Sequence, residues 1–302
     1  MRNWVLVGVP SSAGAHHAGQ ELAPGALRAA GLLDRLRAAG ISVADGGDLP
    51  MTPFELGEPP YRNLSAVVRV AGLVRDRVAS VLADGAIPLI VGGDCTITLG
   101  VVAGYGRDVR LVYVDGDMDL GSRGNTDTPG SGILDSTGVS HLLGDGAPEL
   151  TSLGGPGSAG DGAEAEPLIE PDRLALVGGD PRETSDAGRH YLTDRGVVFQ
   201  EGPALAADPA GTARRALAAV GPGPLLVHFD VDVIDSGDLP LANFPHYDSG
   251  VSAAQAFACL RELGAEHSLT GLVLTEVNPT HDPSGRLIER YLDGIVGALA
   301  ER

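Results

Sequence analysis

The chain has 302 residues, and its 40 acidic residues against 21 basic ones give a formal net charge of −19. Phosphate recognition needs a basic surface, so this charge excludes nucleic acid from the expected partners. No apolar run is long enough to span a bilayer, and the N-terminal sequence lacks the basic and apolar parts of a signal peptide. Two cysteines cannot build a disulfide framework. We therefore expect a cytoplasmic protein without a membrane partner.

All 21 basic residues are arginine, because the chain contains no lysine. A catalytic lysine that forms a Schiff base is therefore excluded. Phosphate binding by a P-loop, which requires a lysine, is excluded for the same reason.

Short apolar runs alternate with longer amphipathic segments along the chain. Strands are predicted at seven apolar runs: Val5–Val9, Ile87–Val91, Leu111–Val114, Leu174–Val177, Val197–Phe199, Leu225–Phe229 and Leu272–Leu274. Helical spacing predicts helices that begin near Pro24 and that cover about Leu64–Leu82, Thr212–Val220, Ala253–Leu263 and Leu287–Leu299. Near-continuous apolar strands separated by helices are typical of a parallel sheet with helices on both faces.

These elements predict a three-layer α/β fold, in which residues 1–302 form a single domain without internal repeats. Residues 144–168 are rich in Gly, Ser, Ala and Glu. We interpret this segment as a mobile excursion inside the domain and not as a linker between two domains.

Four of the predicted strands end in polar clusters. The clusters are Gly92–Cys95, Asp115–Asp119, Asp230–Asp232 and Thr275–Asn278. Open parallel sheets bind their ligands beyond the carboxyl ends of the strands. Side chains two residues apart in an extended segment point to the same side, so Asp115, Asp117 and Asp119 are expected to converge. The same spacing predicts that Asp230 and Asp232 converge.

Five carboxylates in one partly buried site repel one another and need cations to stay ionised. Oxygen ligands favour Mg, Mn or Ca, and a nearby thiolate or imidazole shifts the preference toward Mn, Fe or Zn. A single D-x-D after a strand is as often a cap or a surface turn, but two such clusters favour a metal site. The aspartyl-phosphate phosphatases also carry a D-x-D after a strand, near the start of the chain and with a lysine further on, and this chain offers neither.

From Val5 to about Pro279 the sequence resembles the arginase/agmatinase (ureohydrolase) family. The matching motifs are Gly8-Val9-Pro10, Gly92–Thr96, Asp115–Asp119, Ser131-Gly132, Phe229–Asp235 and Glu276–Pro279. The resemblance implies a three-layer arginase-like fold, a small-molecule substrate and a homo-oligomer of three or six chains. It also implies two Mn ions held by two histidines and four aspartates, with Fe or Zn as alternatives to Mn.

Carried over by resemblance, the four aspartates are Asp115, Asp119, Asp230 and Asp232, with Asp115 and Asp230 as the bridging pair. Both family histidines are replaced. The predicted metal ligands are therefore Cys95, Asp115, Asp117, Asp119, Asp230 and Asp232, with Cys95 and Asp117 at the former histidine positions. Both replacements can still bind a cation.

The predicted substrate site combines a family residue with departures from the family pattern. By resemblance, Glu276 pairs with the guanidinium or amidinium group of the substrate, and Ser131 belongs to the same pocket. Ile133 stands where the family has an asparagine that contacts the α-carboxylate of arginine, and Asp135 stands where it has a mobile-loop histidine. Ser236 replaces a proline after the D-x-D-x-x-D run. We therefore expect a substrate other than free L-arginine.

Three histidines are candidates for chemistry beside the carboxylates. His228 lies two residues before Asp230, so it is expected either to supply an imidazole on that face or to be an ordinary core histidine. His141 and His246 are expected in loops near the pocket, as proton shuttles or as surface residues. Asp135, His141 and His228 are the candidates for the acid that protonates the leaving amine.

The leading hypothesis is hydrolysis of a C–N bond in a guanidino, amidino or N-hydroxyguanidino compound. Two cations ~3.5–4 Å apart acidify the attacking water, and Glu276 holds the cationic group. Five aspartates and a thiolate carry more negative charge than two divalent ions neutralise, which weakens the metals as Lewis acids. The alternative is a non-hydrolytic arginase-fold binding or regulatory protein with a degenerate metal site. Loss of the family histidines favours this alternative, whereas ligand-capable residues at all six positions favour the enzyme.

Overall fold

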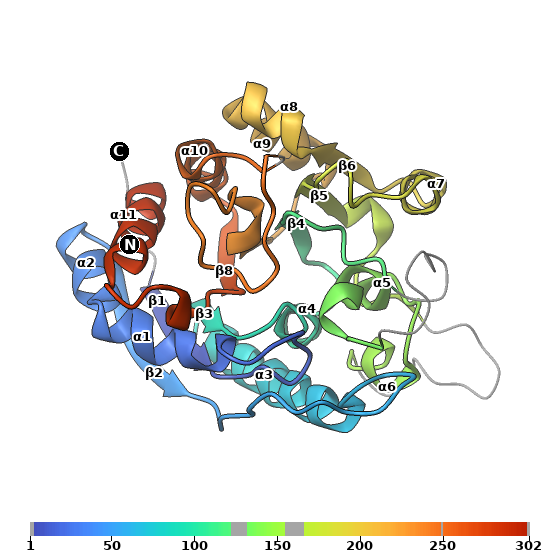
Figure 1. The fold of residues 1–302 in the computed structure, drawn as a ribbon, viewed down its shortest axis with the longest axis horizontal. Coiled ribbons are helices and arrows are strands. Elements are labelled where there is room, and N and C mark those ends of the chain that lie inside the picture. Colours follow the sequence, from blue (N-terminus) through green and yellow to red (C-terminus); the bar gives the residue numbers. More distant parts are fainter. Residues whose placement is uncertain (1–2, 122–131, 155–165, 249, 301–302) are drawn as a thin grey trace.

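The computed structural model describes residues 3–121, 132–154, 166–248 and 250–300. Eight strands form one sheet in the order β2-β1-β3-β8-β7-β4-β5-β6, and every neighbouring pair is parallel (Figure 1). The strands are β1 (Asn3–Val9), β2 (Ser42–Asp48), β3 (Ile87–Gly92), β4 (Arg110–Val114), β5 (Leu174–Gly178), β6 (Val198–Glu201), β7 (Leu225–Asp230) and β8 (Leu269–Thr275). The predicted parallel sheet is therefore confirmed.

Helices cover both faces of the sheet. Alternate residues of each strand point to opposite faces, so Leu89 and Val91 of β3 join one apolar core and Ile90 joins the other. The first core is closed by α1 (Ala23–Ala29), α2 (Leu32–Ala38), α8 (Gly202–Ala207), α9 (Pro209–Ala219), α10 (Ala253–Gly264) and α11 (Arg286–Leu299). The second is closed by α3 (Leu64–Ala83), α4 (Ile97–Tyr105), α5 (Gly138–Leu142), α6 (Pro148–Thr151) and α7 (Asp186–Asp194). The three predicted layers are confirmed.

Several elements were not predicted from the sequence, and for two of them, β2 and α4, the structure gives a physical reason. Strand β2 lies at the edge of the sheet, and only Val43 in it is buried, so its sequence lacks an apolar run. Helix α4 is buried around its first six residues and therefore shows no amphipathic stripe. Gly100 lets α4 approach α3 closely, since a Cβ there would lie 2.3 Å from the carbonyl oxygen of Ala71.

The segment predicted as a mobile excursion is described only at its two ends. Residues 155–165 lie outside the described residues. On either side of them, Leu150, Leu153 and Leu168 are buried in the second core. The two described ends of the segment are therefore packed into the second core, and its predicted mobility stays a prediction.

In the part of the chain that the structure describes, no helix combines the length and the apolar character needed to cross a membrane.

Candidate metal centre

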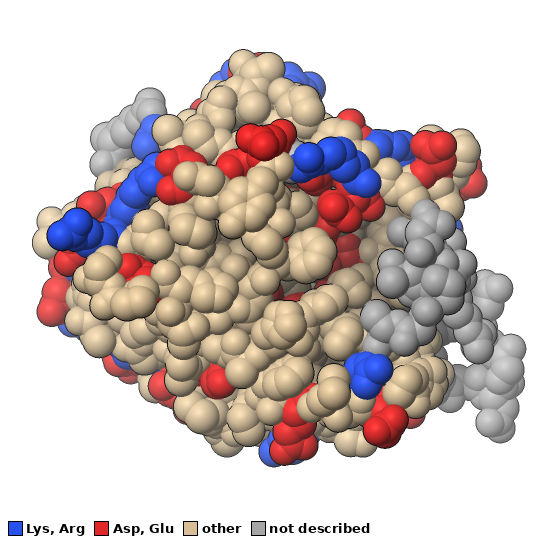
Figure 2. Space-filling view, viewed as in Figure 1, with Lys and Arg blue, Asp and Glu red and all other residues tan. Residues whose placement is uncertain are grey.

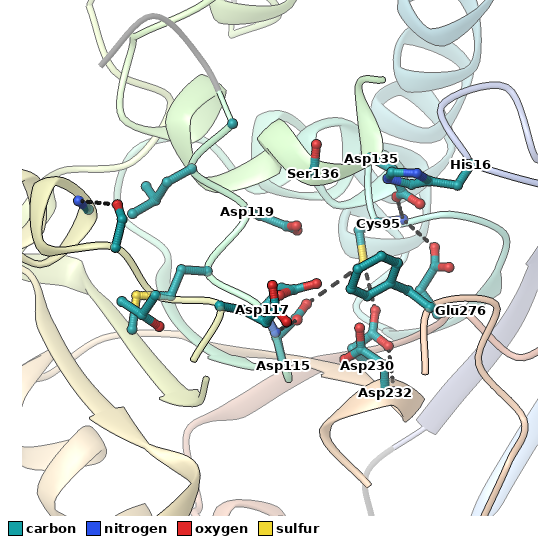
Figure 3. A pocket seen from close by; sticks show the side chains of 18 residues that line it. His16, Cys95, Asp115, Asp117, Asp119, Asp135, Ser136, Asp230, Asp232 and Glu276 are labelled. Atoms are coloured by element: carbon teal, nitrogen blue, oxygen red, sulfur yellow. Dashed lines mark hydrogen bonds between the residues drawn. The ribbon is translucent and has the colours of Figure 1, made fainter. Parts of the chain in front are cut away.

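A cavity of about 370 Å³ opens at the carboxyl ends of the central strands. Figure 2 shows a hollow near the middle of one face, with acidic side chains in its depth and mostly uncharged residues around it. Side chains that follow four strands line this cavity (Figure 3). They are Cys95 after β3, Asp115, Asp117 and Asp119 after β4, Asp230 and Asp232 at the end of β7, and Glu276 after β8. The predicted convergence of the four clusters is therefore what the structure shows.

The turn after β3 presents Cys95 to the cavity. Gly93 is required there, because a Cβ on it would lie 2.1 Å from the carbonyl oxygen of Ser11. The carboxylate of Asp94 accepts hydrogen bonds from the backbone N–H groups of Gly14, at 3.0 Å, and Thr96, at 3.1 Å. These contacts hold the turn rigidly against the first loop of the chain.

A first cluster contains Cys95, Asp115, His228 and Asp230, whose ligand atoms lie within 4.8 Å of one another. The Cys95 thiol donates to Asp230 Oδ2 at 2.7 Å and lies 3.9 Å from Asp115 Oδ2. His228 Nε2 lies 3.7 Å from the Cys95 sulfur and 3.6 Å from Asp115 Oδ2. Thiol, imidazole and carboxylates in this arrangement are a donor set for a divalent transition metal.

His228 is fixed in one orientation by the residues around it. Its ring stacks on the Tyr113 ring with centroids 3.8 Å apart, and its Nδ1 atom lies 2.8 Å from Thr98 Oγ1. Burial lowers the pKa of His228 to about 3. The imidazole is therefore neutral, as a ligand must be, and its Nε2 atom faces the first cluster. His228 does not line the cavity, so this position suits a metal ligand better than an acid that touches the substrate.

A second cluster contains Asp117, Asp232 and His246. His246 Nε2 lies 3.7 Å from Asp117 Oδ2 and 3.7 Å from Asp232 Oδ2, while Nδ1 lies 3.6 Å from Asp180 Oδ2. Burial opposes a charge on this ring, but the two carboxylates of the cluster raise the pKa of His246 to about 11. The ring is in the buried interior and not in a surface position.

A third group joins Cys95 to Asp135 and Glu276 (Figure 3). The backbone N–H of Cys95 donates to Asp135 Oδ1 at 2.8 Å and to Glu276 Oε1 at 3.1 Å. The amide of Gln20 donates to Glu276 Oε2 at 2.6 Å. Glu276 has a φ of 64°, a left-handed conformation that costs a non-glycine residue about 1–3 kcal/mol. The surrounding contacts thus hold a strained residue in place.

Asp119 lines the cavity but belongs to none of these three groups. Its Oδ2 accepts a hydrogen bond from the Tyr113 hydroxyl at 2.5 Å, and its φ of 48° is also left-handed. The backbone N–H and the hydroxyl of Ser140 both donate to the backbone oxygen of Asp119, at 3.3 Å and 3.5 Å. The carboxylate therefore stands beside the first cluster, held by Tyr113.

Several carboxyl groups at the site bind protons more tightly than usual. Burial first, and neighbouring carboxylates second, raise the pKa values of Asp115, Asp119, Asp135, Asp230 and Glu276 well above the ordinary range. Burial, followed by Asp230 and Asp115, likewise raises the pKa of the Cys95 thiol. Divalent cations would remove this penalty, and the oxygen, sulfur and nitrogen donors fit them. The buried His246 Nε2 has no hydrogen-bond partner among the described residues, which fits the same interpretation.

Besides His228, two predicted site residues, His141 and Ile133, do not line the cavity. His141 was expected in a loop, but it lies in α5, where Nδ1 is 2.8 Å from the Thr137 carbonyl oxygen and Nε2 accepts from the Ala147 N–H at 3.0 Å. Both ring nitrogens are thus occupied by backbone, and the role of acid does not fit. Ser131 lies outside the described residues.

The sequence did not single out Gln20, Thr98 or Asp180, which contact Glu276, His228 and His246. Asp180 could have been predicted, because it follows β5 just as the other acidic residues of the site follow their strands. Gln20 and Thr98 lie in a short helical turn and in α4, where nothing in the sequence pattern marks them.

Comparisons with known proteins decide the family. The family model described as "Arginase family" matches residues 2–292. The chain belongs to the arginase family. It is 26% identical to an arginase of Bacillus caldovelox over 289 residues, which cover 92% of this chain and 91% of that protein. The solved structure of B. caldovelox arginase matches with a TM-score of 0.86 and 23% identity, covering 100% of this chain and 99% of that chain.

Two solved structures with other names share the fold of this arginase-family chain. Formimidoylglutamase from Bacillus subtilis has a TM-score of 0.72 and 18% identity, covering 99% of this chain and 86% of that one. Proclavaminate amidino hydrolase from Streptomyces clavuligerus has a TM-score of 0.69 and 22% identity, covering 99% and 90%. At these identities the likeness shows the fold and leaves the substrate open.

Proposed function

We propose that this chain is a metal-dependent hydrolase that cleaves a C–N bond of a guanidino, amidino or N-hydroxyguanidino small molecule. The observation that carries the proposal is the convergence of ligand-capable side chains from four strand ends in one cavity of an arginase-family chain. The names of its structural neighbours, which include an amidino hydrolase and a formimidoylglutamase, support the same substrate class.

We further propose which residues would hold two divalent cations, with Mn favoured and Fe or Zn as alternatives. Cys95, Asp115, His228 and Asp230 would hold one cation, and Asp117 and Asp232 would hold the other. Asp119, which lines the same cavity, would be a further ligand, as the family resemblance implies. Two such cations supply Lewis acidity and lower the pKa of the attacking water.

Glu276 is the proposed anchor for the cationic group of the substrate. Its two oxygens accept hydrogen bonds from the Cys95 N–H and from Gln20, and the residue lines the cavity, where a bound cationic group would favour the charged carboxylate. A planar guanidinium or amidinium matches a carboxylate through paired hydrogen bonds. Asp135 lies in the same group, and burial, followed by Asp94, raises its pKa. Asp135 is the proposed donor of a proton to the leaving amine.

Free L-arginine fits this cavity poorly. Among the described residues that line it, there is no arginine to pair with an α-carboxylate, and Glu183 adds a further negative charge. A carboxylate in the substrate would meet repulsion there. We propose that the substrate carries a neutral or cationic tail.

The test combines metal analysis with a substrate panel. Purified protein loaded with Mn is assayed for urea or ammonia release from L-arginine, decarboxylated arginine, formimidoyl compounds and N-hydroxyguanidines. The Asp230→Asn variant should lose bound metal and activity together. The matched control is Asp235→Asn, because Asp235 belongs to the same acidic run but lies outside the clusters. Absence of bound metal and of turnover in the wild-type protein would favour the binding-protein alternative, and L-arginine as the best substrate would contradict the proposed tail.

A further inference from the structure

His246 is a buried histidine with one nitrogen that has no protein partner. The residue is 3% exposed, and its Nε2 atom has no hydrogen bond among the described residues. Asp117 Oδ2 and Asp232 Oδ2 are each 3.7 Å away. An N–H···O hydrogen bond requires 2.7–3.2 Å, so the nitrogen faces both carboxylates without bonding to either. Buried polar atoms in folded proteins rarely lack a hydrogen-bond partner, so the nitrogen is expected to bind an atom or ion that the protein itself does not supply.

The three donor atoms surround a space that suits one cation. Metal bonds to imidazole nitrogen and carboxylate oxygen are about 2.0–2.2 Å long. With bonds of about 2.1–2.2 Å, two ligand atoms that are 3.7 Å apart subtend about 115–125° at the ion. The separation is thus too long for a hydrogen bond but suitable for two ligands of the same ion.

Two further features hold the ring in this position. Nδ1 lies 3.6 Å from Oδ2 of the buried Asp180, which is beyond hydrogen-bond distance but places a carboxylate on the side where metal-binding histidines have their partner. Gly116 leaves room for the ring, because a Cβ there would lie 2.9 Å from both Cδ2 and Nε2 of His246. The imidazole therefore occupies space that almost any other residue at position 116 would fill.

We propose that His246 Nε2 is a ligand of the second divalent cation, together with Asp117 and Asp232, and that Asp180 is its positioning residue. The inference rests on the proposed two-cation centre. It means that the imidazole lost at position 117 is supplied from the loop after β7. The cation would then have a neutral nitrogen ligand in addition to its carboxylates.

The competing arrangement is an imidazolium that neutralises the two carboxylates in place of a cation. A buried ion pair is stable only with well-formed hydrogen bonds, and charged N–H···O contacts are about 2.7–2.9 Å long. At 3.7 Å the ring nitrogen lies near both carboxylates, but it forms neither of the hydrogen bonds that would stabilise a buried ion pair. The geometry therefore favours the metal ligand.

The experiment measures Mn binding to cation-free protein by equilibrium dialysis, with metal content per chain as the readout. The variants are His246→Ala, Asp180→Asn and Gly116→Ala. The matched control is His267→Ala, because His267 is exposed and precedes β8 at the opposite end of the sheet from the site. Co-loaded protein is also examined by proton NMR, because the ring N–H of a Co-bound histidine gives a strongly shifted signal that disappears in deuterated water.

We expect His246→Ala and Gly116→Ala to weaken one Mn site about 100-fold or more and to remove one shifted N–H signal. Asp180→Asn should weaken the same site about 10–100-fold, as the loss of a partner behind a ligand does. His267→Ala should change nothing. Unchanged metal binding and an unchanged NMR spectrum in His246→Ala would overturn the inference, while two ions in the wild type would leave the proposed function intact. A wild-type protein that binds no ion would instead contradict the proposed function.

Discussion

Removal of divalent cations should make the stability of the folded protein decrease as the pH rises. In the cation-free protein, burial and neighbouring carboxylates raise the pKa of a set of carboxyl groups well above the ordinary range. The set is Asp115, Asp119, Asp135, Asp230 and Glu276. The folded state thus keeps protons that the unfolded chain releases once the pH passes about 4.

The sign of the effect follows from these raised values. The contribution of each group is fully present below its unfolded pKa and is lost as the pH rises through its folded pKa, at about 1.4 kcal/mol for every pKa unit. His246 acts in the same direction, because the folded state raises its pKa from 6.5 to about 11. Asp232 opposes the trend: burial raises its pKa, but His246 and backbone contacts outweigh burial and lower it. His228 also opposes it below about pH 6.5, because burial lowers its pKa to about 3 and the unfolded chain binds the extra proton. These two groups at the site are outnumbered by the raised ones.

Bound divalent cations should restore the stability that the cation-free protein loses as the pH rises. A ligand present at 1,000 times its Kd stabilises the folded state by about 4.1 kcal/mol. An unfolding entropy of about 2.1 cal/mol/K per residue gives about 0.63 kcal/mol/K for 302 residues, so each tight ion raises Tm by about 6–7 °C. Because cation binding releases the trapped protons, the gap in Tm between Mn-loaded and chelated protein should widen as the pH rises.

The assay is calorimetry of the chelated and the Mn-loaded protein between about pH 5 and pH 8, above the ordinary pKa of a carboxyl group. Asp115→Asn should flatten the pH dependence of the chelated form, since it removes one of the titrating groups. The control Asp235→Asn should leave it unchanged. A Tm of the chelated protein that rises with pH, or a gap that narrows, would refute the reasoning.

Three further predictions concern single features of the site and the assembly. Glu276→Gln should lower kcat/KM by about 100-fold without changing metal content, because a charge-assisted hydrogen bond to the substrate is worth about 1.5–3 kcal/mol; a loss of metal instead would show that Glu276 is not a substrate anchor. Cys95→His with Asp117→His should raise Mn affinity and shift the pH–rate profile to lower pH, because two negative charges leave the metal site; an unchanged affinity and profile would mean that neither residue binds metal. Light scattering should give a mass of three or six chains, as the family resemblance implies, and a monomer would contradict that expectation.

The sequence predicted the parts of the fold that depend on regular patterns. Apolar runs located seven of the strands, and the polar residues that follow them placed Asp115 and Asp230 at one edge of the sheet. The pattern failed for β2, whose edge position needs little apolar sequence, and for α4, whose burial removes the amphipathic signal. Both failures arise because tertiary position, and not local periodicity, decides which residues are apolar.

The site was predictable only where chain connectivity brings residues together. Asp230 and Asp232 are adjacent in an extended segment, so their convergence follows from local geometry. The contact of His246 with Asp117 depends on the path of the loop after β7, which no spacing reveals. The sequence also predicted His141 near the pocket. In the structure, its two ring nitrogens instead contact the backbone carbonyl of Thr137 and the backbone N–H of Ala147.

Each of the two positions where the family resemblance implies a histidine has a histidine beside it in the fold. His228 stands beside Cys95 in the first cluster, and His246 stands beside Asp117 in the second. In the proposed two-cation site, neutral imidazoles would add donor atoms without adding charge, so the thiolate and the extra carboxylate would still leave the cations in a more anionic environment. Cations in such an environment would be weaker Lewis acids and would lower the pKa of a bound water molecule less. A site of this kind suits a substrate whose carbon is more electrophilic than that of a plain guanidinium, which is why N-hydroxyguanidines belong in the substrate panel. The thiol of Cys95 donates to Asp230 Oδ2 in the cation-free protein, so a cation that binds there takes the place of that proton.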